Sequence, residues 1–370
     1  MPEINLNEFI EFCKYHKMEN IAFLMLLKTN AKLIYPQEMN GLKRAYQTSI
    51  MVQATQQHYL DMVTKTFEEE GIDYLLLKGR DLAMLYPSED MRQSSDFDIY
   101  IGAENAKKAK PLMMNMGFEI VSYEEERDWH DEYLAKKWVM CELHKVLIQG
   151  DYPWRKGCNE MVNNLTLKEG SNHCYKMCKE DFYVYNLAHA AKHMKLSGIG
   201  IKVFVDIELI YTLYKDSFDY EYLNKRLEKC NLKEFDKNVR KLCEYWFEDA
   251  TPEDDIVYEM EKYVAQSGWI GTKEQAVSTE LAQNYGKTQS KTLAKIKKCF
   301  KIIFCPYEEM AIKYPVLKKH KYLTPIFRIR RAFSAVLKRR DVIRSVSATL
   351  DSGDISEGRK ILEFKKSIGL

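Results

Sequence analysis

Two aspartates separated by one residue are the first side chains in this sequence whose types and spacing could perform chemistry. Asp96 and Asp98 lie in an apolar run, so on an extended strand both carboxylates point to the same face. Adjacent carboxylates repel each other, and a divalent cation is the usual means of relieving that repulsion. Upstream, an apolar strand ends at Lys78-Gly79-Arg80, a glycine turn that opens onto a short helix whose N–H groups could bind phosphate. The combination predicts a site for a magnesium–nucleotide complex.

A third carboxylate stands on a later predicted strand. Residues 132–148 are expected to form a hairpin, and in its second strand Glu142 and His144 share one face. Together with the two aspartates, Glu142 would complete a cluster that binds two Mg²⁺ ions and leaves positions for phosphate oxygens. The alternative for Glu142 is an exposed residue of an edge hairpin. His144 either contacts the acceptor or a carboxylate, or it is a structural histidine.

Hydrophobic periodicity, together with glycine and proline, predicts the elements that position these side chains. Residues 73–150 alternate strand and helix and finish in antiparallel strands, which indicates a compact α/β unit. Its strands are expected at 73–78, 96–101, 118–123, 132–138 and 139–148, and its helices at 80–86 and 103–116. Helical patterns precede it at 5–32 and 39–70 and follow it at 182–194, 203–214, 220–230, 232–247, 254–265, 291–304 and 325–340.

The residues around the Asp-x-Asp resemble a known family pattern. That pattern has a Leu-Lys-Gly turn, a Tyr-Pro pair, an arginine and an Asp-x-Asp strand, followed by a strand reading acidic-Leu-His-Trp. This chain matches it at Leu77-Lys78-Gly79, Tyr86-Pro87, Arg92, Asp96-Phe97-Asp98-Ile99 and Glu142-Leu143-His144, with Lys145 in place of the tryptophan. The sequence therefore resembles the uncharacterised nucleotidyltransferase family of the polymerase-β-like superfamily.

The resemblance implies an α+β fold. We expect a polymerase-β-like nucleotidyltransferase core with a mixed sheet, flanked by N-terminal helices and a C-terminal helical domain. The expected boundaries give an N-terminal helical segment (1–70), the core (71–165), a helical domain (166–285) and a basic helical C-terminal region (286–370).

The resemblance also implies a reaction, the Mg-dependent transfer of a nucleoside monophosphate from a nucleoside triphosphate to a hydroxyl or amine. Asp96 and Asp98 would hold both metal ions. Glu142 would complete the site of the ion that lowers the pKa of the attacking group, and would also act as base. Mg²⁺ is the expected cofactor, with Mn²⁺ as the alternative. Metal binding and alignment would carry most of the catalysis.

Six further residues are candidates for contacting the nucleotide: Lys78, Gly79, Arg80, Arg92, Ser95 and His144. The wider superfamily usually has Gly-Ser where this chain has Gly79-Arg80. Charge-assisted hydrogen bonds from Arg80, Lys78 or Arg92 would then replace those of a serine hydroxyl.

Three of these candidates have structural alternatives. Lys78 would be a lysine at a strand end that snorkels to water. Arg92 would form an ion pair with Glu89 or Asp90, and Ser95 would only turn the loop.

Composition indicates a globular chain of more than one domain, with 370 residues, 30% charged and 46% hydrophobic. The N-terminus lacks the pattern of a signal peptide, and no apolar stretch approaches the roughly 18 residues of a spanning helix. Nine scattered cysteines favour reduced thiols and a cytoplasmic location. Residues 287–340 carry sixteen Lys and Arg against Glu308 and Glu309. This region would either pack with its charges in solvent or contact an anionic acceptor or a membrane surface.

Two other functions are compatible with an Asp-x-Asp strand. A GT-A-type glycosyltransferase also holds a nucleotide-sugar diphosphate through Asp-x-Asp and a metal. That fold needs a longer Rossmann-like domain before the aspartates, and only one predicted strand precedes Asp96 in the core unit. The second alternative is a nucleotide-binding or interaction protein that has lost catalysis, and Arg80 at the usual serine position leaves this alternative open.

Overall fold

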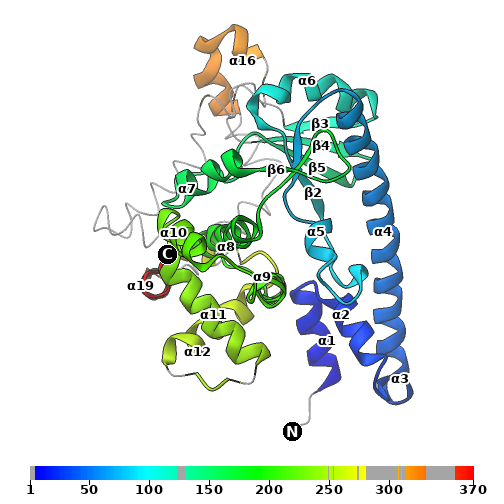
Figure 1. Cartoon of the computed structure of the whole chain (residues 1–370), viewed down its shortest axis with the longest axis vertical. Helices are drawn as coiled ribbons and strands as arrows, with labels where there is room; N and C mark the ends of the chain where they lie inside the picture. The colour runs from blue at the N-terminus through cyan, green and yellow to red at the C-terminus, as the bar shows by residue number, and fades with distance from the viewer. Residues whose placement is uncertain are drawn as a thin grey trace. The chain divides into compact units, whose positions relative to one another are not determined.

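The computed structural model describes residues 5–122, 130–248, 250–252, 254–272, 275–280, 307, 310, 314, 316–330 and 355–370. The chain divides into two compact units. The first comprises residues 1–192 and 199–269, and the second comprises residues 193–198 and 270–370. Figure 1 labels helices and strands of the described residues.

The first unit is organised around a mixed sheet that has seven strands in the described part of the chain. The strands are β1 (Tyr74–Leu76), β2 (Asp96–Tyr100), β3 (Glu119–Ser122), β4 (His130–Ala135), β5 (Val139–His144), β6 (Thr166–Leu167) and β7 (Cys174–Lys176). Their spatial order is β3-β4-β5-β2-β1-β7-β6. β2 is parallel to β5 and β1 to β7, whereas the other neighbours are antiparallel. The expected α+β fold with a mixed sheet is confirmed.

One face of the sheet packs against α4 (Pro36–Glu69) and α6 (Gly102–Asn115). Leu60, Val63 and Phe67 of α4 follow helical spacing, and they join Ile99 and Leu143 of the strands in one buried cluster. Because side chains alternate along a strand, burial of the apolar residues on this face directs the polar residues of β2 and β5 to the opposite face.

The connection from β1 to β2 begins with a glycine turn. Gly79 has φ +65° and ψ −105°, a conformation that side chains rarely adopt. It is followed by α5 (Arg80–Ala83) and the short 3₁₀ helix η1 (Glu89–Met91). The expected helix at 80–86 therefore ends early, and the chain continues through turns to the start of β2.

Helices of the C-terminal half lie against the polar face of the sheet. His189 of α8 (Lys179–Leu196) contacts Lys78 at the end of β1, and Asp206 of α9 (Ile201–Tyr214) pairs with Arg92 before β2. The other helices of this unit are α1 (Leu6–Tyr15), α2 (Glu19–Leu26), α3 (Ala31–Ile34), α7 (Arg155–Asn159), η2 (Glu160–Asn164), α10 (Tyr220–Lys229), α11 (Lys233–Phe247) and α12 (Asp255–Ser267).

The described part of the second unit is helical. It contains α16 (Val316–Lys319), η3 (Lys321–Leu323), a helical run at 324–330 and α19 (Ile355–Ser367). The Lys195 ammonium donates to the Leu370 carbonyl at 3.2 Å, and the Lys365 ammonium donates to the Lys195 carbonyl at 3.0 Å. The basic helix expected at 291–304 lies outside the described residues, as does the end of the one expected at 325–340.

The sheet extends beyond the expected C-terminal boundary of the core at residue 165. β6 and β7 belong to the sheet although they follow residue 165, so strands of the core enter the segment 166–285. The division into four segments otherwise stays a prediction.

Within the described ranges, no helix has the length and apolar character needed to cross a membrane.

Candidate functional site

The register between β2 and β5 brings the predicted acidic residues together. Asp98 pairs with Glu142, and Tyr100 pairs with His144, in a parallel arrangement. The alternation of each strand puts Asp96, Asp98, Glu142 and His144 on one face, while the residues between them are buried in the core. Sequence periodicity alone specifies the face, and the parallel pairing decides which side chains are neighbours.

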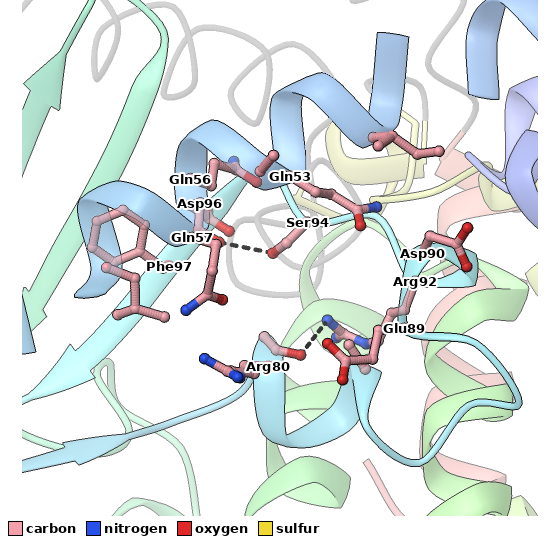
Figure 2. Close-up of a pocket in the computed structure, with 15 residues that line it drawn as sticks. Gln53, Gln56, Gln57, Arg80, Glu89, Asp90, Arg92, Ser94, Asp96 and Phe97 are labelled. Carbon is pink, nitrogen blue, oxygen red and sulfur yellow. Dashed lines mark hydrogen bonds between the residues drawn. The ribbon is translucent and has the colours of Figure 1, made fainter. Parts of the chain in front are cut away.

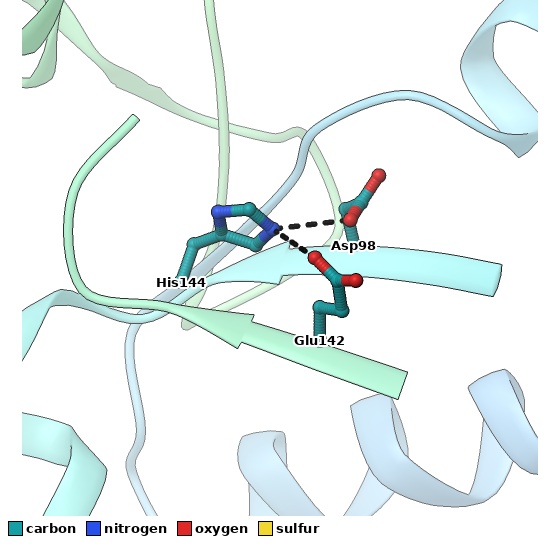
Figure 3. A group of neighbouring side chains, drawn as sticks. All are labelled: Asp98, Glu142 and His144. Atoms are coloured by element: carbon teal, nitrogen blue, oxygen red, sulfur yellow. Dashed lines mark hydrogen bonds and ion pairs between the residues drawn. The ribbon is translucent and has the colours of Figure 1, made fainter. Parts of the chain in front are cut away.

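Asp98, Glu142 and His144 offer a set of potential metal ligands (Figure 3). One ligand atom from each residue lies within 4.8 Å of the other two. His144 Nε2 is 3.0 Å from Asp98 Oδ1 and 3.4 Å from Glu142 Oε2. Two carboxylate oxygens and an imidazole nitrogen form a donor set that fits a divalent cation. The group contains two of the three predicted carboxylates and the histidine expected to contact the nucleotide, whereas Asp96 lies outside it.

Lys78 supplies a positive charge to this cluster. Its Nζ lies 2.9 Å from Asp98 Oδ2 and 2.9 Å from His189 Nε2. The Lys78 side chain is only 16% exposed. The ammonium therefore faces the carboxylates, and the alternative of a lysine that snorkels to water does not describe this position.

The neighbouring groups lower the pKa of Asp98 and Glu142 and raise the pKa of His144. Burial acts to raise the pKa of Asp98, but the Lys78 ammonium and the hydrogen bond from His144 hold that pKa well below its usual range. Burial acts to lower the pKa of His144, but its hydrogen bonds to Asp98 and Glu142 outweigh burial and raise it. Burial likewise acts to raise the pKa of Glu142, and the hydrogen bond from His144 lowers it. The cluster thus favours charged carboxylates beside a charged histidine.

Asp96 occupies a different electrostatic environment from Asp98. Burial and the neighbouring Asp98 carboxylate raise the pKa of Asp96 to about 6, although Lys78 acts in the opposite direction. Ser95 Oγ donates to Asp96 Oδ1 at 3.3 Å. Ser95 therefore contacts the carboxylate of the residue that follows it.

Arg92 is held by a residue that sequence reasoning does not connect to it. Its Nε donates to Asp206 Oδ1 at 2.8 Å and its Nη2 donates to Oδ2 at 3.0 Å. The Tyr86 hydroxyl donates to the same carboxylate at 2.8 Å. Arg92 Nη1 also donates to the Gly79 carbonyl at 3.3 Å. The buried guanidinium is thus neutralised by Asp206, not by its acidic neighbours in sequence, and it ties the glycine turn to α9.

A cavity of about 300 Å³ opens beside Asp96, between α4, α5 and the start of β2 (Figure 2). Its polar lining includes Gln53, Gln56, Gln57, Gly79, Arg80, Glu89, Asp90, Arg92, Ser94 and Asp96. Arg80 is 45% exposed at this cavity, and its Nη1 lies 3.8 Å from Asp61 Oδ1. The cavity is at the lower end of the size range of small-molecule pockets. Four predicted site residues (Gly79, Arg80, Arg92 and Asp96) therefore line one hollow.

One face of α8 lies beside the site, although none of the predicted site residues belongs to this helix. Tyr185, His189 and Lys192 are spaced by four and three residues, so they lie on the same side of the helix. Burial raises the pKa of Tyr185 and lowers that of Lys192, and the charges of Lys78, Asp98 and Glu142 act on both. The spacing was visible in the sequence, but nothing local indicated that this face meets β2 and β5.

β4 also contributes to the site and to its support. His130 Nε2 lies 3.9 Å from Glu142 Oε2, and the His130 ring is 5.3 Å from the His144 ring. Lys145, which replaces the tryptophan of the resembling family pattern, is buried, and its Nζ lies 2.9 Å from Asp131 Oδ1. The departure from that pattern is therefore accompanied by a buried ion pair between β4 and the residue after β5.

A comparison with known proteins identifies the family of this chain. A model of the family described as uncharacterised nucleotidyltransferase matches residues 2–248. The matched region contains the whole sheet, both carboxylate-bearing strands and the helices α8 and α9. No curated protein and no solved structure gives a significant match. The family match spans most of the chain, and the chain is therefore a member of the uncharacterised nucleotidyltransferase family.

Proposed function

We propose that this protein transfers a nucleoside monophosphate from a nucleoside triphosphate to a hydroxyl or amine acceptor, in a reaction that depends on Mg²⁺ or Mn²⁺. Family membership supports nucleotidyl transfer in general. The observation that carries the finer proposal is the convergence of Asp98, Glu142 and His144 within 4.8 Å, next to Asp96 on the same sheet face.

The donor set fits a divalent cation. Asp98 and Glu142 would hold it through oxygen, and Asp96 would add a carboxylate from the same face of β2. His144 Nε2 would serve as a nitrogen donor once it has lost its proton. When bound, the cation would supply positive charge to the phosphates and lower the pKa of the attacking group. Lys78 compensates part of the carboxylate charge here, so the ammonium and a cation would compete for Asp98.

The transfer is a substitution at the α-phosphorus. A new bond forms between the acceptor oxygen or nitrogen and the α-phosphorus. The bond from the α-phosphorus to the bridging oxygen breaks, and that oxygen keeps the electron pair as pyrophosphate leaves. The acceptor proton passes to the Glu142 carboxylate. These residues act by alignment and by charge, which are the main sources of rate in phosphoryl chemistry.

The remaining candidates have separate roles in this proposal. Gly79 allows close approach of the turn, and Arg80 and Ser95 offer hydrogen bonds to phosphate oxygens beside the cavity. Arg92 keeps the Gly79 turn in place through its hydrogen bond to the carbonyl. His144 orients both carboxylates.

The test is an assay with each α-labelled nucleoside triphosphate, Mg²⁺ or Mn²⁺, and an extract that supplies acceptors. We expect pyrophosphate release and a labelled acceptor that mass spectrometry can identify. Glu142→Gln should abolish both, whereas Asp216→Asn, at an exposed position after α9, should leave them unchanged. Turnover of a nucleotide sugar instead would favour the glycosyltransferase alternative. Nucleotide binding without turnover would favour the inactive one.

A further inference from the structure

Two lysines from segments far apart in the sequence lie close to the loop that leads into β2. Lys17 stands between α1 and α2, and Lys202 is in the first turn of α9. The residues next to them are hydrogen-bonded: the Ile201 backbone N–H donates to His16 Nδ1 at 3.5 Å. His16 is fully buried, and its Nε2 lies 3.2 Å from the Ala265 carbonyl, so the junction is fixed on both sides of the ring.

The same junction is tied to the loop before Asp96. The Lys202 ammonium donates to the Gln93 carbonyl at 2.7 Å. The Gln93 side-chain amide donates to Asn20 Oδ1 at 2.6 Å, and the Asn20 amide donates to the Asp90 carbonyl at 2.6 Å. Asn20 is fully buried, so this network orders the loop and the α1–α2 junction together.

Neither lysine has a carboxylate partner among the described residues. Lys17 Nζ lies 3.4 Å from the centre of the Trp269 ring, and the Lys202 ammonium donates to the Gln93 carbonyl. Lys17 also has φ +53°, a left-handed conformation that is unfavourable for a residue with a side chain. A partly buried ammonium group without a counter-ion in direct contact costs free energy, and a bound anion would reduce that cost.

The positive charges of Arg92 and Lys17 near Lys202 favour the binding of an anion. Burial, together with smaller contributions from the nearby Arg92 and Lys17, lowers the pKa of Lys202 to about 8. Burial also lowers the pKa of Lys17. Carboxylates act in the opposite direction: Glu19 and Asp96 raise the pKa of Lys17, and Asp206 and Asp96 raise that of Lys202. Arg92 is not available for this role, because Asp206 already binds its guanidinium at both oxygens.

We infer that Lys17 and Lys202 form an anion subsite that binds the β- and γ-phosphates of the nucleoside triphosphate, the part that leaves as pyrophosphate. This inference rests on the proposed function. Ammonium groups with unused N–H donors match phosphate oxygens, and the N-terminus of α9, a helix of 14 residues, adds positive potential beside Lys202. The carboxylates then lie at the α-phosphorus end and the lysines at the leaving-group end.

The experiment is calorimetric titration of the full chain with inorganic pyrophosphate and, separately, with a nucleoside monophosphate, both in the presence of Mg²⁺. Lys17→Met and Lys202→Met should each weaken pyrophosphate binding about tenfold, and the double variant should abolish it. Monophosphate affinity should change little. Lys202→Arg, which keeps the charge, should retain most of the affinity. Lys14→Met is the matched control, because it removes one exposed charge from the same segment and should leave both affinities unchanged.

The outcomes separate the inference from the function on which it rests. Pyrophosphate binding that is absent in the wild type, or unchanged in the double variant, overturns the subsite. An equal loss of monophosphate affinity also overturns it, because the lysines would then bind the α-phosphate. If the wild type transfers no nucleotide but the variants lose pyrophosphate binding, the subsite stands and the proposed function fails. Thermal denaturation of each variant shows that it is folded.

Discussion

Asp98 stands directly opposite Glu142 in the parallel pairing of β2 with β5, and His144 lies within 3.4 Å of an oxygen of each. Two carboxylates at neighbouring positions would normally repel each other. Here Lys78 on one side and His144 on the other compensate the charge of Asp98 and lower its pKa. The consequence is that both carboxylates favour the ionised form.

The ion pair between Lys78 and Asp98 predicts a stability effect in addition to an effect on activity. Relief of carboxylate repulsion alone would make Asp98→Asn nearly neutral for stability. Because this substitution removes the counter-charge of a buried lysine, we expect the free energy of unfolding to fall by about 3 kcal/mol. Transfer should also be lost. Urea denaturation measures the first effect, with Asp216→Asn as the control, and an unchanged unfolding free energy would contradict the ion pair.

The nitrogen donor at the cluster predicts a metal preference. His144→Gln should weaken Mn²⁺ binding about tenfold and Mg²⁺ binding less, because imidazole suits Mn²⁺ better than Mg²⁺. Calorimetric titration with each metal alone tests this without any substrate. His58→Gln, at an exposed position of α4, is the control. Equal losses for both metals would show that His144 acts only on the carboxylates.

The link between Arg92 and Asp206 predicts a large loss of stability on removal of the carboxylate charge. Asp206→Asn weakens the acceptor of both Arg92 and Tyr86 and leaves a buried guanidinium without a counter-ion, so we expect a loss of about 3 kcal/mol or more. Chemical denaturation measures it. The double variant Arg92→Met/Asp206→Asn should recover part of the loss, and no recovery would indicate that the two residues are not coupled.

The lowered pKa of Lys202 predicts a defined pH dependence of the unfolding free energy. Its pKa is lowered from 10.5 to about 8 in the folded chain, mainly by burial, so between these values the unfolded chain binds more protons. The contribution of Lys202 to stability therefore rises with pH from about 8 to 10.5. The unfolding free energy of the wild type, compared with that of Lys202→Met, should be lowest below pH 8 and should rise steadily up to pH 10.5. A difference in unfolding free energy that is independent of pH would contradict this.

Local pattern was sufficient for much of the fold. The alternation around Asp96 and Asp98 specified the exposed face of β2, and the glycine at position 79 specified the turn after β1. Helical periodicity gave α4, α6 and the helices from α8 to α12 within a few residues. These features depend on steric limits and side-chain periods that act over a few residues, so the sequence contains them directly.

The neighbours in the site were decided only by the tertiary structure. Parallel pairing of β5 with β2 put Glu142 beside Asp98, and packing of α9 gave Arg92 its partner more than a hundred residues away. The approach of Lys17 and Lys202 likewise depends on a hydrogen bond between distant segments. Such contacts form because whole faces of helices and strands must bury their apolar sides against one another. The spacing of residues within a single segment does not specify which faces pack together.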